Sequence, residues 1–562
     1  MDKQIKVMLG LCFYIVFYTL VVSLRYKLEK QETDECTKHT RRYLYCTGNR
    51  NGSLTNTDNH QIIYTQLNEV ISEKEALQHK PCQDQSLAAN ARLSRLYYLD
   101  SPYKEYEIGD KIYVIATLFD SYGGRKLSGG DHLRARIWNQ NLNASAPGVV
   151  YDHNNGSYTL IFEALWSGKS RISATISYTR EAITAFYRMT SEVVSLRNIF
   201  AKYKVNNYDE DSLCHADLNH LLAHTNYKDA CNFTSLNSGM PWYCGKPQNP
   251  QLRCSDWKFL KSDRPKIPST ISKCEKELLQ HSSHQVIKTV LKVFVKGQKK
   301  NNRRTILQYY QPSIPCSKYN TTSLWYRKHT TGFFFKRRWH LTLCQGFKGT
   351  TFQECVRNKR LYLVGDSTTR QWYSNICERY NCTYSAERTK FEGSEMLSIR
   401  KVESHNITVI NALHCQPVHI GNYFRNPKHS LISIPKRLES ISSNEDAIFL
   451  FHIFAHMSTL HHENFRNKMR LIRVSIEKLL ERNNKVKIFI KMPHTYTEDK
   501  GGINDFFGYV FSRIIFETFN GLYKKVIILN NRDATNSVAS VPLHPDNFIV
   551  SAMVDQMLSF VC

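Results

Sequence analysis

A serine at a strand-to-helix turn is the residue of this sequence best placed to act as a nucleophile. Residues 361–372 read LYLVGDSTTRQW: four apolar residues typical of a short buried strand, then Gly365, Asp366 and Ser367, then a segment with helical periodicity. The pattern predicts that Ser367 opens a helix, where unpaired N–H groups and the helix dipole favour an attacking oxygen and a developing oxyanion. Gly-Asp-Ser alone usually marks an ordinary turn, so the hypothesis depends on the neighbouring elements.

A serine nucleophile needs a base, and the base needs an acid that orients it. The candidate base is His544, which stands directly before the apolar segment 548–561, a predicted last helix. The candidate acid is Asp533, which follows the apolar run 525–530 by a few residues and should lie on the same rim of a sheet; the next aspartate upstream is Asp505. The alternative is that Asp533 is a loop residue and His544 part of a surface turn.

Two further histidines, His452 and His456, stand four positions apart on or beside the apolar run 447–454. On one strand they would face the same side. Three interpretations stay open for them: hydrogen-bonded core residues, contact with an oxyanion or substrate (for His456), or metal binding. No third ligand is evident, so no metal site is predicted. His461 and His462 open the next predicted helix and are interpreted as surface residues.

The elements that must position these side chains follow from about residue 331, where the pattern becomes α/β. Helical periodicity falls between several strand candidates and is clearest over residues 463–483. Alternating strands and helices predict a mostly parallel sheet with helices on both faces, and ligands of such sheets lie beyond the C-terminal ends of the strands. Ser367 follows such an end. The strand candidates are residues 361–364, 406–412, 447–454, 486–492 and 525–530.

The chain before residue 331 divides into three segments beyond its N-terminal run. Residues 25–90 are polar and are interpreted as a stem. Residues 91–190 contain short alternating strands between Gly, Asn and Asp turns, which predict a β-sandwich, and residues 156–176 resemble the end of a filamin-type immunoglobulin repeat. Residues 191–330 contain six cysteines and are interpreted as a connector; their basic run 296–304 is either a solvated loop or an attractor of acidic glycans.

The N-terminus carries an uncharged apolar run of 18 residues, 7–24, with basic residues on both sides. That length spans a bilayer and exceeds the ~7–15-residue core of a cleaved signal peptide. We therefore predict a signal-anchor over residues 1–24, which makes a single-pass type II membrane protein with everything beyond it lumenal. The alternative is a cleaved signal and a secreted protein.

Cysteines and glycosylation sequons agree with that compartment. Fifteen of the 16 cysteines lie beyond the apolar run and are predicted to form disulfides, with the odd one free or pairing between chains. No Cys-x2-Cys spacing supports a zinc site. Sequons for N-glycosylation occur at Asn51, Asn143, Asn155, Asn232, Asn320, Asn381 and Asn406.

The formal net charge of +27, with a pI near 9.4, calls for acidic partners. A mean hydropathy of −0.45 excludes a polytopic membrane protein. Because an anchored, cysteine-rich chain does not meet nucleic acid, the expected partner is an acidic, sialylated glycan or glycoprotein.

Taken together, these features resemble the NXPE family, in which a neurexophilin-like region precedes a PC-esterase domain of the SGNH hydrolase type. The resemblance covers most of the lumenal chain. It implies that Ser367 is the nucleophile, His544 the base and Asp533 its partner. By the same resemblance, Gly365, Asp366, Arg370 and His456 either shape the turn or contact the oxyanion and the substrate. The matching residues are Trp339, Cys344, Gly365 to Thr368, Arg370 to Trp372, Ala455, His456, Asp533, Thr535, His544, Pro545 and Cys562.

The chain departs from the SGNH pattern at two places. Such enzymes carry their acid and histidine as Asp-x-x-His, whereas Val541 occupies the place of the acid here and Asp533 lies eleven residues before His544. The usual Gly-x-Asn-Asp block is absent as such. Residues 502–505 have its letters but lie late in the chain, and Asn504 is interpreted as a helix cap.

Relatives with PC-esterase domains transfer or remove acetyl groups on glycans. The resemblance implies an O-acetyltransferase of the Golgi lumen that takes acetyl from acetyl-CoA, holds no bound cofactor and acts on sialic acid of glycoproteins. Two alternatives stay open. If water accepts the acetyl group, the same residues make an O-acetylesterase; if the serine is a remnant of the fold, the chain is an inactive neurexophilin-like binding protein.

Overall fold

The computed structural model describes residues 71–264, 266–280, 284–299, 306–325, 330–347, 352–384, 389–391, 394–418, 432–497 and 504–562. The predicted anchor, most of the predicted stem and the sequon at Asn51 lie outside these ranges, as does most of the basic run 296–304. Within the described ranges, no helix combines the length and apolar character needed to cross a membrane. The anchor therefore stays a prediction from sequence.

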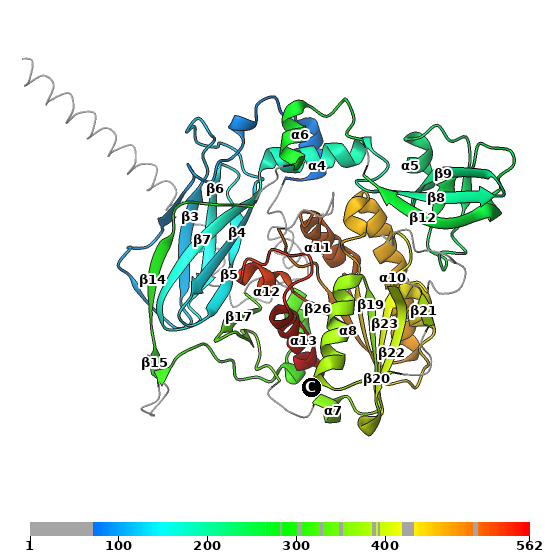
Figure 1. Ribbon diagram of the computed structural model, residues 1–562. Coiled ribbons are helices and arrows are strands. Elements are labelled where there is room, and N and C mark those ends of the chain that lie inside the picture. The colour runs from blue at the N-terminus through cyan, green and yellow to red at the C-terminus, as the bar shows by residue number, and fades with distance from the viewer. Residues whose placement is uncertain are drawn as a thin grey trace, which may run out of the picture. The chain divides into compact units, whose positions relative to one another are not determined.

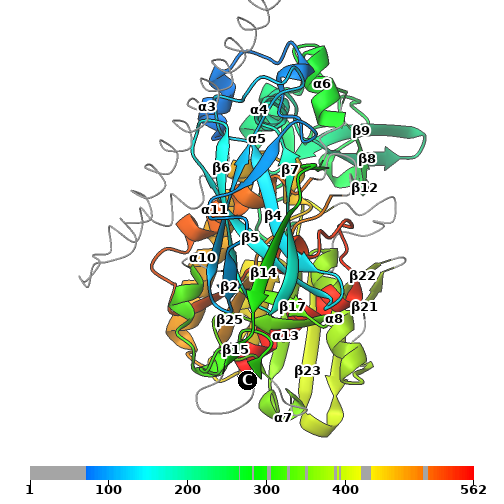
Figure 2. The same cartoon turned by 90° about the vertical axis from the view of Figure 1, so that its left-hand side faces the viewer.

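The predicted β-sandwich is present as an antiparallel assembly. One part pairs β1 (Arg95–Tyr98), β3 (Lys111–Thr117), β6 (Ser157–Glu163) and β5 (Ala144–Asp152). The other continues from β5 through β4 (His132–Asn139) and β7 (Gly168–Tyr178), which lie side by side in Figure 2. Inward-facing apolar side chains of both parts form one core.

Strands from beyond residue 190 complete this sandwich, which the sequence analysis did not foresee. Strand β14 (Leu291–Lys296) pairs with β7, and β17 (Gly332–Phe335) pairs with both β18 (Arg338–Leu341) and β5. In β14 the side chains alternate between buried and exposed, so Leu291, Val293 and Val295 reach the core. The sequence shows the alternation of apolar and polar residues in β14, but it does not indicate a strand partner more than a hundred residues away.

The segment interpreted as a cysteine-rich connector contains a small sheet of its own. Its strand order is β10 (Ala230–Asn232), β11 (Tyr243–Gly245), β9 (Tyr208–His215), β8 (Asn198–Val205) and β12 (Trp257–Asp263). The disulfides Cys214–Cys244 and Cys231–Cys254 staple it around the buried Trp242. Cross-links of this kind compensate for a small hydrophobic core.

Five disulfides within the described ranges confirm the prediction that cysteines of this chain form disulfides. Besides those two, they join Cys82 to Cys274, Cys316 to Cys344 and Cys355 to the terminal Cys562. In the described ranges Cys377, Cys382 and Cys415 are not in disulfides. The six described sequon asparagines are all exposed on the surface, which leaves room for a glycan at each.

The C-terminal domain is the α/β domain that the sequence predicts. Five parallel strands lie in the order β23 (Ile407–Leu413), β19 (Arg360–Gly365), β24 (Ala447–His452), β25 (Lys487–Lys491) and β26 (Val526–Leu529), and the antiparallel β22 (Ser394–Val402) joins at the β23 edge. Helix α8 (Ser367–Arg379) lies beside α13 (Asn547–Val561), and α10 (His462–Arg482) beside α11 (Phe507–Thr518) (Figure 1).

The strand order reverses at β19. The next parallel strand in the chain, β23, pairs with one side of β19, and the parallel strand after it, β24, pairs with the other. In open α/β sheets a crevice for ligands forms at this point, beyond the C-terminal ends of the strands. Ser367 follows the end of β19, so it stands at the switch point of the sheet.

Candidate active site

A tight turn between β19 and α8 presents Ser367. Asp366 caps the helix, since its Oδ1 accepts hydrogen bonds from the Thr368 amide at 2.9 Å and the Thr368 hydroxyl at 2.7 Å. Ser367 is the first helical residue and is half-buried. Gly365 must be glycine, because an added Cβ would lie 2.3 Å from the carbonyl oxygen of His452.

We expect Gly365→Ala to displace this turn. The added methyl group meets the backbone of β24 and, at 2.5 Å, the hydroxyl of Thr369. Because the backbone cannot move aside cheaply, the cost should be about 1–3 kcal/mol in the free energy of unfolding. Serine reactivity should fall strongly, because a 1 Å misplacement can cost ~100-fold in rate. Urea unfolding and labelling by a fluorophosphonate measure the two effects. Gly346→Ala is the control, since its Cβ would meet nothing closer than 3.4 Å. Equal labelling of the two variants would contradict the expectation.

His544 is brought to the serine. Its Nε2 lies 2.7 Å from Ser367 Oγ, across 177 residues of sequence. The chain on both sides of His544 is held in place: His494 Nε2 bonds to the Leu543 carbonyl at 2.8 Å, and Gln371 donates to the Pro545 carbonyl at 3.2 Å. This is the distance and pairing that a serine nucleophile and its general base require.

The amides of the first helical turn leave one donor for an oxyanion. Those of Thr368, Thr369 and Arg370 all donate to Asp366. Among the described residues, none accepts a hydrogen bond from the backbone amide of Ser367. This free N–H group therefore belongs to the same residue as the candidate nucleophile. An oxyanion formed on a carbonyl attacked by Ser367 would therefore meet this N–H group.

Asp533 lies just beyond β26, as predicted, and has a hydrogen-bond partner that the sequence does not indicate. It lies in α12 (Arg532–Ser537), and its Oδ2 accepts hydrogen bonds from the amide and hydroxyl of Thr331, at 2.8 and 2.7 Å. The structure thus ties Oδ2 of this carboxylate to the strand region before β17. Its assignment as the acid that orients His544 remains a hypothesis from the family resemblance.

Asp533→Asn tests that hypothesis. An asparagine can still accept from Thr331 through its amide oxygen, so from the geometry we expect turnover within about tenfold of wild type, whereas loss of an orienting triad acid costs ~10^3–10^4-fold. Steady-state turnover of an activated acetyl ester is the measurement. A loss in the larger range would return Asp533 to the role of orienting acid.

Behind the turn lies a buried network that keeps Asp366 ionised. Lys491 Nζ donates to the Thr368 hydroxyl at 2.7 Å, and His452 Nε2 lies 3.6 Å from Asp366 Oδ2. Burial alone would raise the pKa of Asp366, but the neighbouring His452 and Lys491 outweigh it and hold that pKa far below its usual range. Burial lowers the pKa of Lys491 to about 8, although Asp366 acts in the other direction. An ionised Asp366 is the stronger helix cap.

His456 stands outside the strand on which it was predicted, since β24 ends at His452 and His456 precedes η6 (Met457–Thr459). Its Nδ1 lies 2.9 Å from Nε2 of His414, whose Nδ1 lies 2.6 Å from the Cys415 carbonyl oxygen. A carbonyl only accepts, so His414 Nδ1 carries the proton; burial lowers the pKa of His414 well below its usual value and keeps it neutral. His414 Nε2 then accepts from His456 Nδ1–H.

The tautomer of His456 follows from this chain of bonds. Burial lowers its pKa to about 4, so the ring is neutral with its proton on Nδ1, and Nε2 is a hydrogen-bond acceptor. An oxyanion needs a donor, so this tautomer suits contact with a substrate hydroxyl better than the predicted oxyanion contact. Asp366 raises the pKa of His456 and His544 lowers it, but burial dominates.

The structure leaves Arg370 exposed on the first turn of α8. Three residues beyond Ser367, it shares a helix face with the nucleophile. Sequence analysis missed Lys491, His494 and the supporting role of Gln371 and His414. A lysine inside the apolar run 486–492 was the one available signal, because a buried lysine needs a partner.

Two models of known protein families match this chain. The model described as the C-terminal domain of NXPE family member 4-like proteins matches residues 339–562, which contain the whole serine and histidine site. The model described as neurexophilin matches residues 120–274. This range begins inside the sandwich and includes the whole small sheet. Together the two matches cover about two thirds of the chain, in the order that the sequence motifs indicate.

Proposed function

Because this chain belongs to the NXPE family, we propose that it is a serine-dependent O-acetyltransferase that modifies sialylated glycans in the secretory pathway. The observation that carries the proposal is the 2.7 Å contact between Ser367 Oγ and His544 Nε2 at the N-terminus of α8. The five disulfides and the neurexophilin match indicate a secretory-pathway or extracellular protein. Membrane anchoring through residues 7–24 and residence in the Golgi lumen belong to the proposal.

The reaction proceeds through an acetyl-serine. His544 Nε2 takes the proton of Ser367, whose Oγ attacks the thioester carbonyl of acetyl-CoA, and the Ser367 amide meets the oxyanion. The thiol of CoA leaves with the proton from His544. A hydroxyl of the acceptor sugar then gives its proton to His544 and attacks the acetyl-serine, which forms the new ester and restores Ser367. If water replaces the sugar, the same steps make an esterase.

Two side chains have the hydrogen-bonding groups that would bind an acidic sugar acceptor. His456 Nε2 accepts a hydrogen bond, so it can orient a sugar hydroxyl. The exposed guanidinium of Arg370 matches a carboxylate in a bidentate geometry. The high positive charge of the whole chain attracts such acceptors over longer range.

Acetyl transfer by the full chain in detergent tests the proposal. Given acetyl-CoA labelled in its acetyl group and a sialylated mucin-type acceptor, the protein should place label on sialic acid, and Ser367→Ala should not. Label released as acetate with none on the acceptor would move the assignment to an esterase. Absence of both, with no fluorophosphonate labelling of the folded protein, would favour the binding role that the neurexophilin match supports.

Arg370→Gln should separate recognition of the acceptor from chemistry. A hydrogen bond to a charged group contributes about 1.5–3 kcal/mol, so we expect KM for the sialylated acceptor to rise about 10- to 100-fold, with little change in hydrolysis of a small neutral acetyl ester. Arg379→Gln is the matched control on the same helix, since Arg379 pairs with Asp555 at 2.7 Å. Equal KM values for both variants would remove Arg370 from acceptor recognition.

A further inference from the structure

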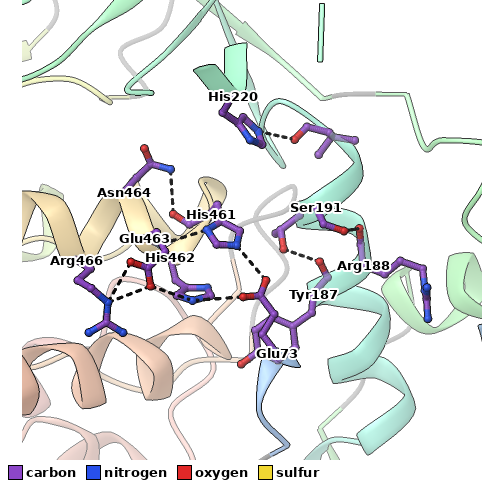
Figure 3. Close-up of polar contacts among 12 residues, drawn as sticks. Glu73, Tyr187, Arg188, Ser191, His220, His461, His462, Glu463, Asn464 and Arg466 are labelled. Carbon is purple, nitrogen blue, oxygen red and sulfur yellow. Dashed lines mark hydrogen bonds and ion pairs between the residues drawn. The ribbon is translucent and has the colours of Figure 1, made fainter. Parts of the chain in front are cut away.

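A cluster of one carboxylate and two imidazoles joins the start of the described chain to the α/β domain. Glu73 is the first residue of α3 (Glu73–Gln78), His461 is the N-cap of α10, and His462 is the first residue of that helix. Figure 3 shows both rings turned toward the Glu73 carboxylate, with one dashed contact from each ring. Glu73 and His461 lie 388 residues apart in sequence.

The spacing of the ligand atoms fits a small divalent ion. His461 Nε2 lies 3.0 Å from Glu73 Oε1, and His462 Nε2 lies 3.5 Å from Glu73 Oε2. One ligand atom from each of the three residues falls within 4.8 Å of the others. Zinc holds nitrogen and oxygen ligands at about 2.0–2.1 Å, which separates the ligands of a tetrahedron by about 3.3–3.4 Å. The two separations between carboxylate oxygen and imidazole nitrogen are thus close to the spacing that one shared ion requires.

The state of His462 is an independent sign of a missing ligand. Its side chain is only 9% exposed, and its Nδ1 is buried with no hydrogen-bond partner in the described part of the chain. Its Nε2 stands 3.5 Å from carboxylate oxygens of both Glu73 and Glu463, at the outer limit of a hydrogen bond. A metal bond would give Nε2 a close partner in place of these two long contacts, with the ring proton on the buried Nδ1.

We propose that Glu73, His461 and His462 bind one divalent ion of the zinc class, through a carboxylate oxygen and the two Nε2 atoms. Water or Glu463, whose Oε1 already faces His462, completes the four-coordinate shell. Because the ligands come from α3 and α10, the ion clasps the segment that follows residue 70 to the α/β domain. The role is structural and is separate from the chemistry at Ser367.

Metal binding would change the tautomer of His461 and one hydrogen bond at the start of α10. Without a metal, His461 Nδ1 accepts from the Glu463 amide at 3.3 Å, so the ring proton sits on Nε2. A metal at Nε2 moves this proton to Nδ1 and ends that long cap bond. The main-chain start of α10 keeps its other support, since the His461 carbonyl accepts from the Asn464 amide at 3.0 Å and from its side chain at 3.1 Å.

The competing arrangement is a metal-free cluster held by the Glu73–His461 hydrogen bond alone. The full chain, stripped with a chelator and titrated with Zn²⁺, distinguishes the two. We expect wild type to retain one more equivalent of zinc, measured by mass spectrometry of the metal, than Glu73→Gln or His462→Gln. We also expect zinc to raise the Tm of wild type but of neither variant. His405→Gln is the matched control, since His405 pairs with Glu354 at 3.1 Å without a third ligand and should leave the zinc count unchanged.

Cobalt substitution keeps the test independent of how the variants fold. In wild type, Co²⁺ at this site should give the visible absorption of tetrahedral N/O coordination, and one equivalent of Zn²⁺ should remove it. Three results would overturn the proposal: the same zinc content in wild type and Glu73→Gln, an equal loss in His405→Gln, or a purely octahedral cobalt spectrum in folded wild type.

Discussion

Ser367→Ala is expected to remove acyl transfer and fluorophosphonate labelling together, with a fall in turnover of ~10^4–10^6-fold. The hydroxyl is the group that bonds to the acyl carbon, and in the described ranges no other serine combines the first position of an α-helix with a histidine at 2.7 Å. His544→Ala should cost nearly as much. Residues that act as a unit are not additive, so the double variant should be scarcely slower than either single one.

The pair Ser404 and His405 in the 3-10 helix η5 (Glu403–His405) supplies the control for this experiment. Ser404 Oγ lies 2.7 Å from His405 Nδ1, the same separation as in the candidate site, but without the buried Asp366 network behind it. Ser404→Ala should leave labelling and turnover unchanged. Labelling that persists in Ser367→Ala would show that the probe reacts elsewhere and would remove the nucleophile assignment.

The features of this site that the sequence predicts are those set by short, local stretches of the chain. The apolar run before Gly365 and the periodic segment after Ser367 are local signals, and both elements form where the sequence predicts them. His544 was found because it stands directly before the last apolar helix, at the rim that parallel strands share. Local pattern and sheet topology together therefore indicate which residues reach the site.

The direction of a side chain depends on partners that the sequence leaves unspecified. Asp533 lies just beyond β26, as predicted. Its carboxylate accepts a hydrogen bond from Thr331, which lies 202 residues upstream and is not indicated by the sequence. His462 looked like a surface residue at a helix start, yet Glu73 from the far end of the described chain lies beside it and the ring is nearly buried. Strand β14 joins the sandwich for a similar reason, since its partner β7 lies more than a hundred residues earlier.

Asp505 was the other acid considered from sequence, and the structure gives it a partner in the sandwich. Its carboxylate forms an ion pair with Arg134 of β4 and accepts from the Tyr178 hydroxyl at 2.7 Å and the Tyr496 amide at 3.2 Å. Asp505 is fully buried, and Arg134 is 7% exposed. Burial alone would lower the pKa of Arg134, but Asp505 outweighs it and raises that pKa. Arg134 therefore keeps its charge inside the protein.

Asp505→Ala should consequently destabilise the protein by about 3–5 kcal/mol in the free energy of unfolding, because it leaves the Arg134 charge buried without its partner. Urea unfolding followed by tryptophan fluorescence measures this. In Glu439→Ala, which breaks the exposed Lys436–Glu439 pair, the loss should stay below about 1 kcal/mol. Replacing Arg134 and Asp505 together with leucines should recover much of the loss, since a buried ion pair exchanged for apolar groups is often neutral. If Asp505→Ala instead kept full stability and lost turnover, Asp505 would act in the chemistry at Ser367 and not in joining the sandwich to the α/β domain.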